Sequence, residues 1–401
     1  MVVKKRGSTK NPPILSHEFM IQNHADIVAC FAMIFVVGLM FQTSSPAASL
    51  FIAIQHNVTV PSNAAPHLPA SPSGEVIMYT AGLKDACGIF FYLLISIVMH
   101  AILQEYVLDK MNRKLHLSRS KHAKFNESGQ LVAFYLVSVV WAVDLIFREF
   151  PNSIHSIWEG YPHTNMSFSY KFFFLLQLSY WLHTFPDLYF HKVKNEDILS
   201  KVSTATIHIL LIGAAYVFSF TRVALALLLL QYTVRFIFHA ARLVNYSVKM
   251  NLSEPLFKVH DLCFCSCSSW KYHRSCTYFL VWTRALSDDQ VLDFSRGNFN
   301  TPLLRLCALV VICLRQAWLM WNFITLQLKL KREKAALTGL GSQSASDKKS
   351  KSKMQQEKAA KRKERQISKK EEVQDDVDDL PEVDQAASKT LRQRNPSGSN
   401  I

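Results

Sequence analysis

The apolar residues of this chain are gathered into long blocks, and this segregation constrains the fold more than any other feature of the sequence. Each block is close to the ~20 residues that a helix needs to cross a bilayer. A backbone in hydrocarbon must satisfy its own hydrogen bonds, so only helices and closed barrels span membranes. The alternation typical of barrel strands is absent. We therefore predict an all-α, polytopic transmembrane helical bundle.

Seven blocks have the length and composition of membrane spans. They are Ala25–Phe41, Gly88–Leu108, Gln130–Phe147, Phe172–Phe190, Val202–Phe220, Val223–Ala241 and Leu303–Leu328. The fifth and sixth are joined only by the Thr221–Arg222 region, which predicts a tight helical hairpin. Small residues after the first block would suit signal-peptide cleavage, but the polar region before it is unusually long, so we expect it to be retained.

Basic residues alternate between the connecting segments, and this alternation predicts the orientation. The N-terminus carries Lys4, Lys5, Arg6 and Lys10, whereas residues 42–83 contain no Lys or Arg and residues 109–124 are again basic. Cytosolic loops carry the excess of Lys and Arg, so the N-terminus is predicted to be cytosolic. Lys329, Lys331, Arg332 and Lys334 place the C-terminus there as well. Topology thus accounts for much of the net charge of +15, without a nucleic-acid partner.

Two cytosolic termini require an even number of spans, so we expect eight rather than seven. The eighth must lie in Met250–Thr301, whose only apolar stretch, Tyr278–Leu286, is short and contains Arg284. Three interpretations remain for this segment: a zinc site, palmitoylated cysteines near the membrane, or a replacement of a span through splicing or a faulty gene model, which we favour. The candidate ligands and acceptors are His260, Cys263, Cys265, Cys267, His273 and Cys276.

Sequons and the C-terminal tail give two further expectations. Asn57 (Asn57-Val58-Thr59) lies in the segment without basic residues and is the predicted site of lumenal glycosylation. From about Lys331 the chain is expected to be largely disordered, because a basic block at 348–370 and an acidic block at 371–384 bury little apolar surface. The basic block is either a solvated tail or a contact for anionic lipid or the ribosome.

Several long motifs resemble the translocating chain-associating membrane protein (TRAM) family. They are SHEFMIQNHADIV (Ser16–Val28), HAILQEYVLDK (His100–Lys110), KHAKFNESGQL (Lys121–Leu131), LSYWLHTFPDLYFHK (Leu178–Lys192) and GNFNTPLLRLCALVVICLRQAWLMW (Gly297–Trp321). The resemblance implies an N-terminal TRAM region (1–115), a TLC-type helical bundle (116–328, atypical at 250–301) and a cytosolic low-complexity tail (329–401).

The same resemblance implies a function. A family member would be a multi-pass endoplasmic reticulum protein beside the Sec translocon channel. It would assist translocation of nascent secretory chains and membrane insertion of nascent transmembrane segments. The alternative is a TLC-type protein that handles membrane lipids or resembles an acyltransferase, as the related ceramide synthases do. Those enzymes use adjacent histidines, and no two of the fifteen histidines here are adjacent. We therefore expect no enzyme, no catalytic residues, no cofactor and no metal.

Four polar residues within the apolar blocks form a candidate intramembrane polar groove. Arg235 and His239 are four residues apart and share one helix face, Asp144 lies in the third block and Arg315 in the last. Charged side chains avoid lipid, so all four are predicted to face the interior. One interpretation is an internal ion pair, Asp144 with Arg315 or Arg235, that only stabilises the bundle. The other is a water-accessible groove in which a partly polar nascent segment dwells before it enters lipid.

Overall fold

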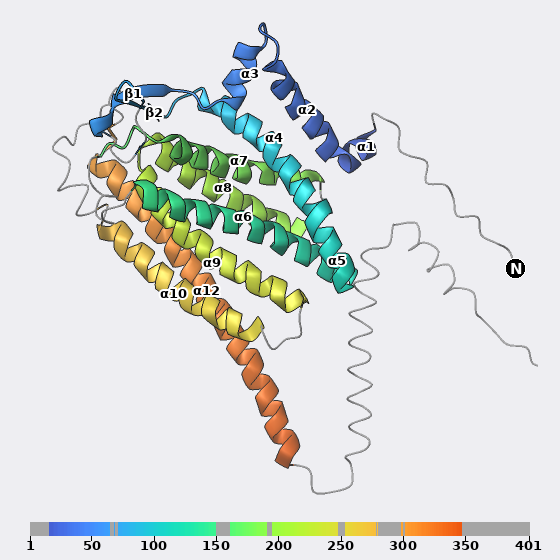
Figure 1. The fold of residues 1–401 in the computed structure, drawn as a ribbon. Coiled ribbons are helices and arrows are strands. Elements are labelled where there is room, and N and C mark those ends of the chain that lie inside the picture. Colours follow the sequence, from blue (N-terminus) through green and yellow to red (C-terminus); the bar gives the residue numbers. More distant parts are fainter. Residues whose placement is uncertain are drawn as a thin grey trace, which may run out of the picture. The chain divides into compact units, whose positions relative to one another are not determined.

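The computed structural model is largely helical in the part of the chain that it describes (Figure 1). The described residues are 16–64, 68, 71–149, 161–190, 195–247, 253–277, 279, 298–299 and 301–346. The chain divides into two compact units, Met1–Ala317 and Trp318–Ile401. The basic and acidic blocks of the tail lie outside the described residues, so their predicted disorder is not tested.

Three short helices form the N-terminal part of the first unit: α1 (His17–Gln22), α2 (His24–Gly38) and α3 (Ser45–Ile52). The first of the predicted spans corresponds to α2, which has 15 residues and is shorter than the ~20 needed to cross hydrocarbon. Aromatic side chains hold α2 and α3 against α4 (Asp85–Ile102), with the Phe35 ring centroid 4.7 Å from Phe51 and 5.9 Å from Phe91.

A small hairpin between α3 and α4 was not predicted. Strands β1 (Asn57–Pro61) and β2 (Glu75–Tyr79) pair antiparallel, with Asn57 opposite Tyr79. The backbones of Tyr79 and Met166 bond to each other at 2.8 Å in both directions, which ties the hairpin to the segment before α7 (Phe168–Phe190). Only Val76 and Met78 are buried in β2, so the alternating pattern is too short to be distinguished in the sequence.

The second predicted span is longer and less regular than expected. Helix α4 continues through a π-helix, η2 (Leu103–Leu108), into α5 (Asp109–Leu115), whose C-cap His116 adopts a left-handed conformation. Single π-helical turns are rare and are frequent at functional sites. Here the π-helix places Gln104, Asp109 and the backbone of His100 against Gln130 and Asn126 of α6 (Arg119–Glu149).

The helices after α6 run back and forth through the same bundle. Helix α7 packs against α4 and α8 (Asn195–Val217), and α9 (Thr221–Ser247) lies along α6. Only three residues separate α8 from α9, and Ser219 among them has a φ of 60°. This confirms the predicted tight hairpin at Thr221–Arg222.

The polar segment 250–301 contains a helix that the sequence did not reveal. Helix α10 (Ser253–Cys276) packs along α9 and runs antiparallel to it, because Phe238 contacts His260 at one end and Phe220 contacts Phe279 at the other. Helix α10 therefore returns the chain to the end of the bundle where α12 (Pro302–Ser346) begins. The Tyr161 hydroxyl accepts a hydrogen bond from the Phe299 amide there, at 3.1 Å.

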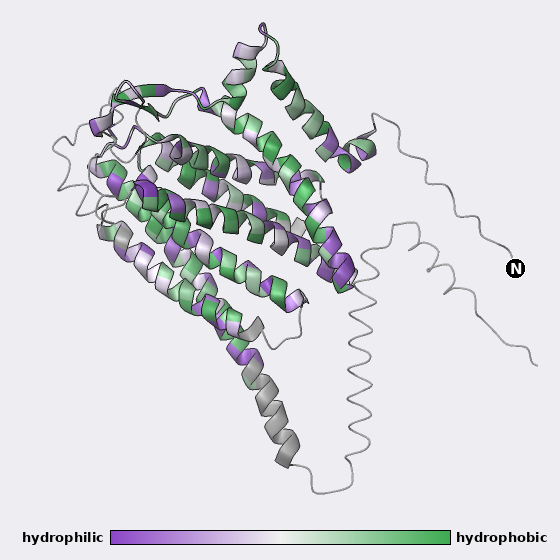
Figure 2. Ribbon diagram, in the orientation of Figure 1, coloured by the Kyte–Doolittle hydropathy of each residue, from purple (hydrophilic) through white to green (hydrophobic). Residues whose placement is uncertain are grey.

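Five described helical segments are long and apolar enough to cross a membrane. They are Asp85–Leu115, Lys121–Glu149, Ile198–Val217, Thr221–Ser247 and Pro302–Glu333. Helix α7 is long enough to cross a membrane but is less hydrophobic than these five segments. About half of its side chains are buried against protein, so aromatic and polar residues take the place of aliphatic ones. Figure 2 shows the contrast between the largely hydrophobic α4 and the paler, more polar α10.

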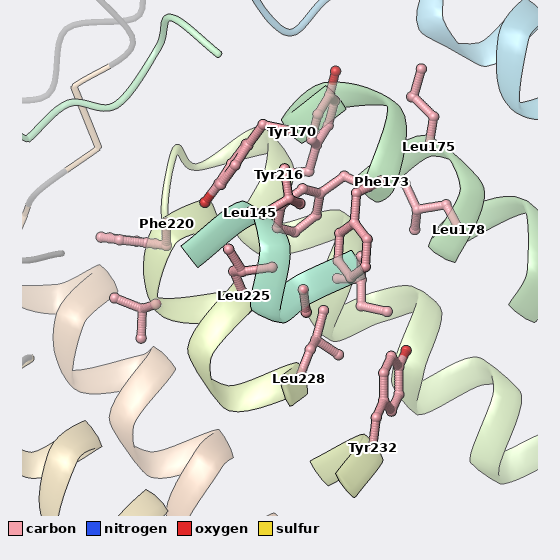
Figure 3. Close-up of a cluster of buried hydrophobic side chains, with 14 of the residues drawn as sticks. Leu145, Tyr170, Phe173, Leu175, Leu178, Tyr216, Phe220, Leu225, Leu228 and Tyr232 are labelled. Atoms are coloured by element: carbon pink, nitrogen blue, oxygen red, sulfur yellow. The ribbon is translucent and has the colours of Figure 1, made fainter. Parts of the chain in front are cut away.

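The core of the first unit is built around α7. Phe173, Phe174 and Leu175 are at most 1% exposed and meet Leu225 and Tyr232 of α9 in one cluster (Figure 3). Helices in lipid gain little from the hydrophobic effect, so close van der Waals packing of this kind holds them together. Helix α12 extends past the predicted end of its span at Leu328 to Ser346, because the residues that follow are mostly good helix formers.

Candidate functional site

One face of α9 carries a row of polar side chains into the bundle. Gln231, Tyr232, Arg235 and His239 follow each other at helical spacing, with Tyr232 fully buried and His239 only 6% exposed. Apart from Thr221 at the start of the helix, the other buried residues of α9 are aliphatic, so these four residues form a polar stripe inside a largely apolar helix. Two of the four predicted groove residues, Arg235 and His239, therefore lie together as expected from their spacing.

Helix α10 adds a cation that the sequence analysis did not select. Lys271 is 6% exposed, and its ammonium donates a hydrogen bond of 2.6 Å to Oε1 of Gln231. Lys271 also lies close enough to Arg235 and Arg315 for their charges to interact, as Arg315 does to Arg235. We call Arg235, Lys271 and Arg315, from three different helices, the cationic cluster.

Rings of neighbouring helices enclose the cationic cluster. His208 of α8 stacks on Trp181 of α7 with ring centroids 3.9 Å apart, and Trp181 donates a 3.0 Å hydrogen bond to the Tyr232 hydroxyl. His239 stacks on Tyr135 of α6 at 5.9 Å. Nδ1 of His239 is buried and has no hydrogen-bond partner among the described residues. The cluster is thus enclosed by aromatic rings, and the buried Nδ1 of His239 beside it is available to a ligand.

Asp144, the fourth predicted groove residue, does not pair with either of the two predicted arginines. Its carboxylate forms an ion pair of 2.8 Å with Arg148, one helical turn further along α6, and both side chains are well exposed. The sequence analysis had paired Asp144 with Arg235 or Arg315. The predicted span ended at Phe147, whereas the helix continues to Glu149 and includes Arg148.

A second buried charge group lies at the end of the bundle that carries the β-hairpin. Lys171 of α7 is fully buried, and its ammonium lies 2.7 Å from Oδ1 of Asp85 and donates hydrogen bonds to the carbonyls of Gln55 (2.9 Å) and Thr80 (2.7 Å). The other carboxylate oxygen accepts from the Tyr216 hydroxyl, at 2.7 Å.

Both members of this ion pair have several polar partners. The ammonium has three oxygen neighbours within 2.9 Å, one from the Asp85 carboxylate and two from carbonyls, and the amide of Gly82 donates a further 2.9 Å bond to Oδ2 of Asp85. We call Lys171, Asp85 and Tyr216 the clamp, because they join α4, α7 and α8 to the backbone on either side of the hairpin. The sequence analysis did not select Lys171 as a site residue, because its only signal was a lysine at the start of an apolar block.

Two histidines that are far apart in the sequence meet between α4 and α7. Nδ1 of His100 lies 3.3 Å from Nε2 of His183, and Nε2 of His100 lies 3.6 Å from Oδ1 of Asp187. Nδ1 of His183 bonds to the Tyr180 carbonyl, so it carries a proton and leaves Nε2 as the acceptor in the neutral ring. His100 must then donate from Nδ1, and the 3.6 Å contact of its Nε2 with Asp187 becomes an ion pair when the His100 ring is protonated.

This histidine pair corrects one argument from the sequence. The absence of adjacent histidines in the sequence was taken as evidence against an enzyme. In the fold His100 and His183 are adjacent, and His183 is 3% exposed. Nothing in a linear sequence marks residues 83 positions apart as neighbours.

The remaining predicted sites are exposed or half-buried. Asn57 is the first residue of β1 and its side chain is exposed, so a glycan would not disturb the core. Cys263, Cys265 and Cys267 lie on α10, where a two-residue step points successive side chains to opposite sides. The described residues contain no group of three or more His, Cys, Asp or Glu side chains placed to hold a metal ion, so no zinc site is formed among them.

Comparison with known proteins gives two kinds of match. The TLC domain family model matches residues 124–325, which include most of α6, all of α7 to α10 and the first part of α12. Translocating chain-associated membrane protein 2 of Homo sapiens is 41% identical over 338 residues, covering 82% of this chain and 86% of that protein. The protein of the same name from Mus musculus matches with the same identity and coverage.

A more distant relative has a different name. Sphingosine N-acyltransferase-like protein ALT7 of Alternaria alternata is 26% identical over 206 residues, which is 51% of this chain and 46% of that protein. The polar stripe of α9, the cationic cluster and His183 lie within the TLC match, whereas His100 and Asp85 precede it. On these matches, together with its helical membrane fold, the chain belongs to the translocating chain-associated membrane protein family and carries a TLC domain.

Proposed function

We propose that this protein assists the translocation of nascent secretory chains and the insertion of nascent transmembrane segments next to the Sec translocon channel. The observation that carries the proposal is the 41% identity, over most of both chains, to relatives named for association with translocating chains. On this proposal the protein resides in the endoplasmic reticulum membrane with both termini in the cytosol. Asn57 then faces the lumen and carries a glycan.

The mechanism that we propose requires no covalent chemistry. A partly polar segment leaves the aqueous channel more easily if it first contacts a membrane-embedded surface in which its polar groups cost less free energy than in lipid. The stripe of Gln231, Tyr232, Arg235 and His239, with the nearby Lys271, supplies such polar groups within the bundle. The basic tail supplies a contact for the ribosome or anionic lipid at the cytosolic face.

The test is site-specific photocrosslinking during translation. A secretory precursor with a photoreactive residue in its signal sequence is translated with microsomes whose only TRAM-family protein is this chain. We expect a covalent adduct that depends on the length of the nascent chain. Absence of an adduct at every length, with the protein present and Asn57 glycosylated, would contradict the proposal. An Asn57→Gln variant, which should lose one glycosidase-sensitive mobility shift, reports the topology.

A second function, lipid handling or acyl transfer, is favoured by one specific observation. His100 lies between His183 and Asp187, and a carboxylate next to two histidines is an arrangement that can carry out general acid–base catalysis. In addition, an N-acyltransferase-like relative shares the TLC region. Acyl transfer from acyl-CoA to a sphingoid base in proteoliposomes tests it. The control is His24→Phe, because His24 stacks on Phe190 elsewhere in the first unit. Loss of the product in His183→Phe, with the product kept in His24→Phe, would support this function. No product with the wild-type protein would reject it.

A further inference from the structure

Two members of the cationic cluster, Arg235 and Lys271, carry positive charge that the described residues around them do not balance. Neither Arg235 nor Lys271 has a carboxylate partner among the described residues, and the acceptor recorded for Lys271 is the neutral side chain of Gln231. His239, one turn further along α9, also lies near arginines, Arg235 and Arg242, rather than near a carboxylate. A buried cation without a counter-charge is costly, and its cost is relieved when an anion binds.

The enclosure of the cluster favours a small anionic group over water alone. Lys271 is 6% exposed, and His239 is equally buried with a free Nδ1 among the described residues. Arg235 presents a guanidinium that can hold a carboxylate through two parallel hydrogen bonds, and Lys271 presents an ammonium. A carboxylate placed between them would accept bonds from both side chains, and His239 would offer a third donor once Nδ1 carries a proton.

The depth of the site distinguishes between possible sources of the carboxylate. Arg235 is the fifteenth of the 27 residues of α9, so it lies about 20 Å along the axis from either end. A lipid head group resides at the membrane surface and would have to be drawn to the middle of the bundle. An acidic residue near the centre of a nascent transmembrane segment is at this depth already.

We propose that the cationic cluster binds the carboxylate of an Asp or Glu carried near the middle of a nascent transmembrane segment. The inference rests on the proposed function and adds a substrate class to it. Segments with a central acid are poorly soluble in lipid and would dwell at Arg235 and Lys271 before they find a partner. Segments with a central Lys would be repelled from the same site.

The experiment compares three nascent segments that differ at a single central position, Asp, Asn or Lys. Each carries a photoreactive residue one turn away and is translated with the microsomes described above. We expect the adduct with the Asp segment to exceed the adduct with the Asn segment by about tenfold, since a charge-assisted hydrogen bond is worth that factor or more. The Lys segment should give the weakest adduct.

Variants of the full-length protein connect the preference to the cluster. The double substitution Arg235→Gln and Lys271→Gln should reduce the Asp adduct to the level of Asn and leave the Asn adduct unchanged. Arg235→Lys, which keeps the charge, should retain the preference. Arg148→Gln is the matched control, because it removes a cation whose exposed side chain is paired with Asp144.

Each outcome separates the two proposals. Equal adducts for Asp, Asn and Lys with the wild-type protein overturn the inference and leave the proposed function standing. No adduct with any segment contradicts the proposed function itself. Equal nascent-chain adducts together with labelling by a photoactivatable phosphatidic acid that requires Arg235 and Lys271 would also overturn the inference, because the cluster would then be a lipid site.

Discussion

The clamp and the cationic cluster both place a buried lysine among helices, but the two lysines have opposite surroundings. The Lys171 ammonium meets a carboxylate and two carbonyls, and the carboxylate is bonded in turn by Tyr216 and Gly82. Lys271 has Gln231 as its acceptor and two arginines within range of its charge. Lys171 has a counter-charge, whereas the described residues provide none for Lys271.

This difference separates a structural role from a binding role. A satisfied ion pair offers nothing to a ligand, and removing one partner leaves an uncompensated buried charge. A cluster of like charges is destabilised by its own repulsion, so removing one member relieves the fold while it removes affinity for an anion. The two sites should therefore respond to substitution with opposite signs in stability.

The largest effect is expected at the clamp. Asp85→Leu leaves Lys171 buried without its counter-charge and should destabilise the protein by about 3–5 kcal/mol, seen as a large drop in thermal unfolding temperature in detergent. The double variant Asp85→Leu with Lys171→Met replaces the pair by apolar groups and should recover much of the loss. If the single and double variants were equally destabilised, the ion pair would not be the cause.

The loss of one hydroxyl should have a smaller effect on the same clamp. Tyr216→Phe removes the 2.7 Å bond to Asp85 while Gly82 and Lys171 remain, so we expect a loss of about 1–3 kcal/mol. Chemical denaturation of the detergent-solubilised protein measures it. Tyr106→Phe, at a well-exposed tyrosine whose hydroxyl makes no hydrogen bond to the described residues, is the matched control and should change stability much less.

At the cationic cluster the sign should reverse. Arg235→Met removes a charge that repels Lys271 and Arg315, and we expect unchanged or slightly higher stability, within about 1 kcal/mol. Thermal unfolding side by side with Asp85→Leu tests the comparison directly. A destabilisation as large as that of the clamp variant would show that Arg235 is a structural residue and that the contrast between the two sites is wrong.

A pH effect is expected in the loop before α7, outside the membrane-spanning helices. Burial, with a smaller contribution from Arg222, lowers the pKa of His163 from its usual 6.5 to about 3. The unfolded chain then binds a proton that the folded chain does not, so stability falls as the pH drops from about 6.5 toward about 3. In His163→Gln this decline should be shallower, which unfolding at pH 7 and pH 5 would measure; identical pH profiles would contradict it.

The smallest effect is expected at Asp144. Its pair with Arg148 is exposed on both sides, and such pairs contribute about 0–1 kcal/mol. Asp144→Asn should leave both the unfolding temperature and nascent-chain crosslinking close to wild type. A strong loss of crosslinking would restore Asp144 to the groove that the sequence analysis assigned to it.

Much of the architecture could be predicted from the sequence because lipid imposes strong local rules. Five of the seven predicted spans became long apolar helices, and the short connection at Thr221–Arg222 became the expected hairpin. The rules fail where protein rather than lipid surrounds a helix. Helix α7 is aromatic and polar because it is central, and α10 is polar because its buried face, with Lys271 and Ser275, packs on α9.

Only part of the candidate site could be predicted from the sequence, for a related reason. The four-residue spacing of Arg235 and His239 fixed their common face, since helical periodicity is local. The partners of the site residues could not be predicted in this way. The pairs are Lys271 with Gln231, Arg148 with Asp144, Asp85 with Lys171 and His100 with His183. Each of these pairings except Asp144–Arg148 joins different helices, and a hydropathy pattern carries no information about which helices become neighbours.

By itself, the sequence determined that this chain is a helical membrane protein and which face of α9 is polar, because burial of the backbone in lipid and the period of the helix act within a segment. Only the tertiary structure decided which charges are balanced. A lysine at the start of α7 and a lysine on α10 look alike in the sequence, yet one meets Asp85 and the other meets Gln231 beside Arg235. Charge balance is a property of neighbours in space, and those neighbours are chosen by packing.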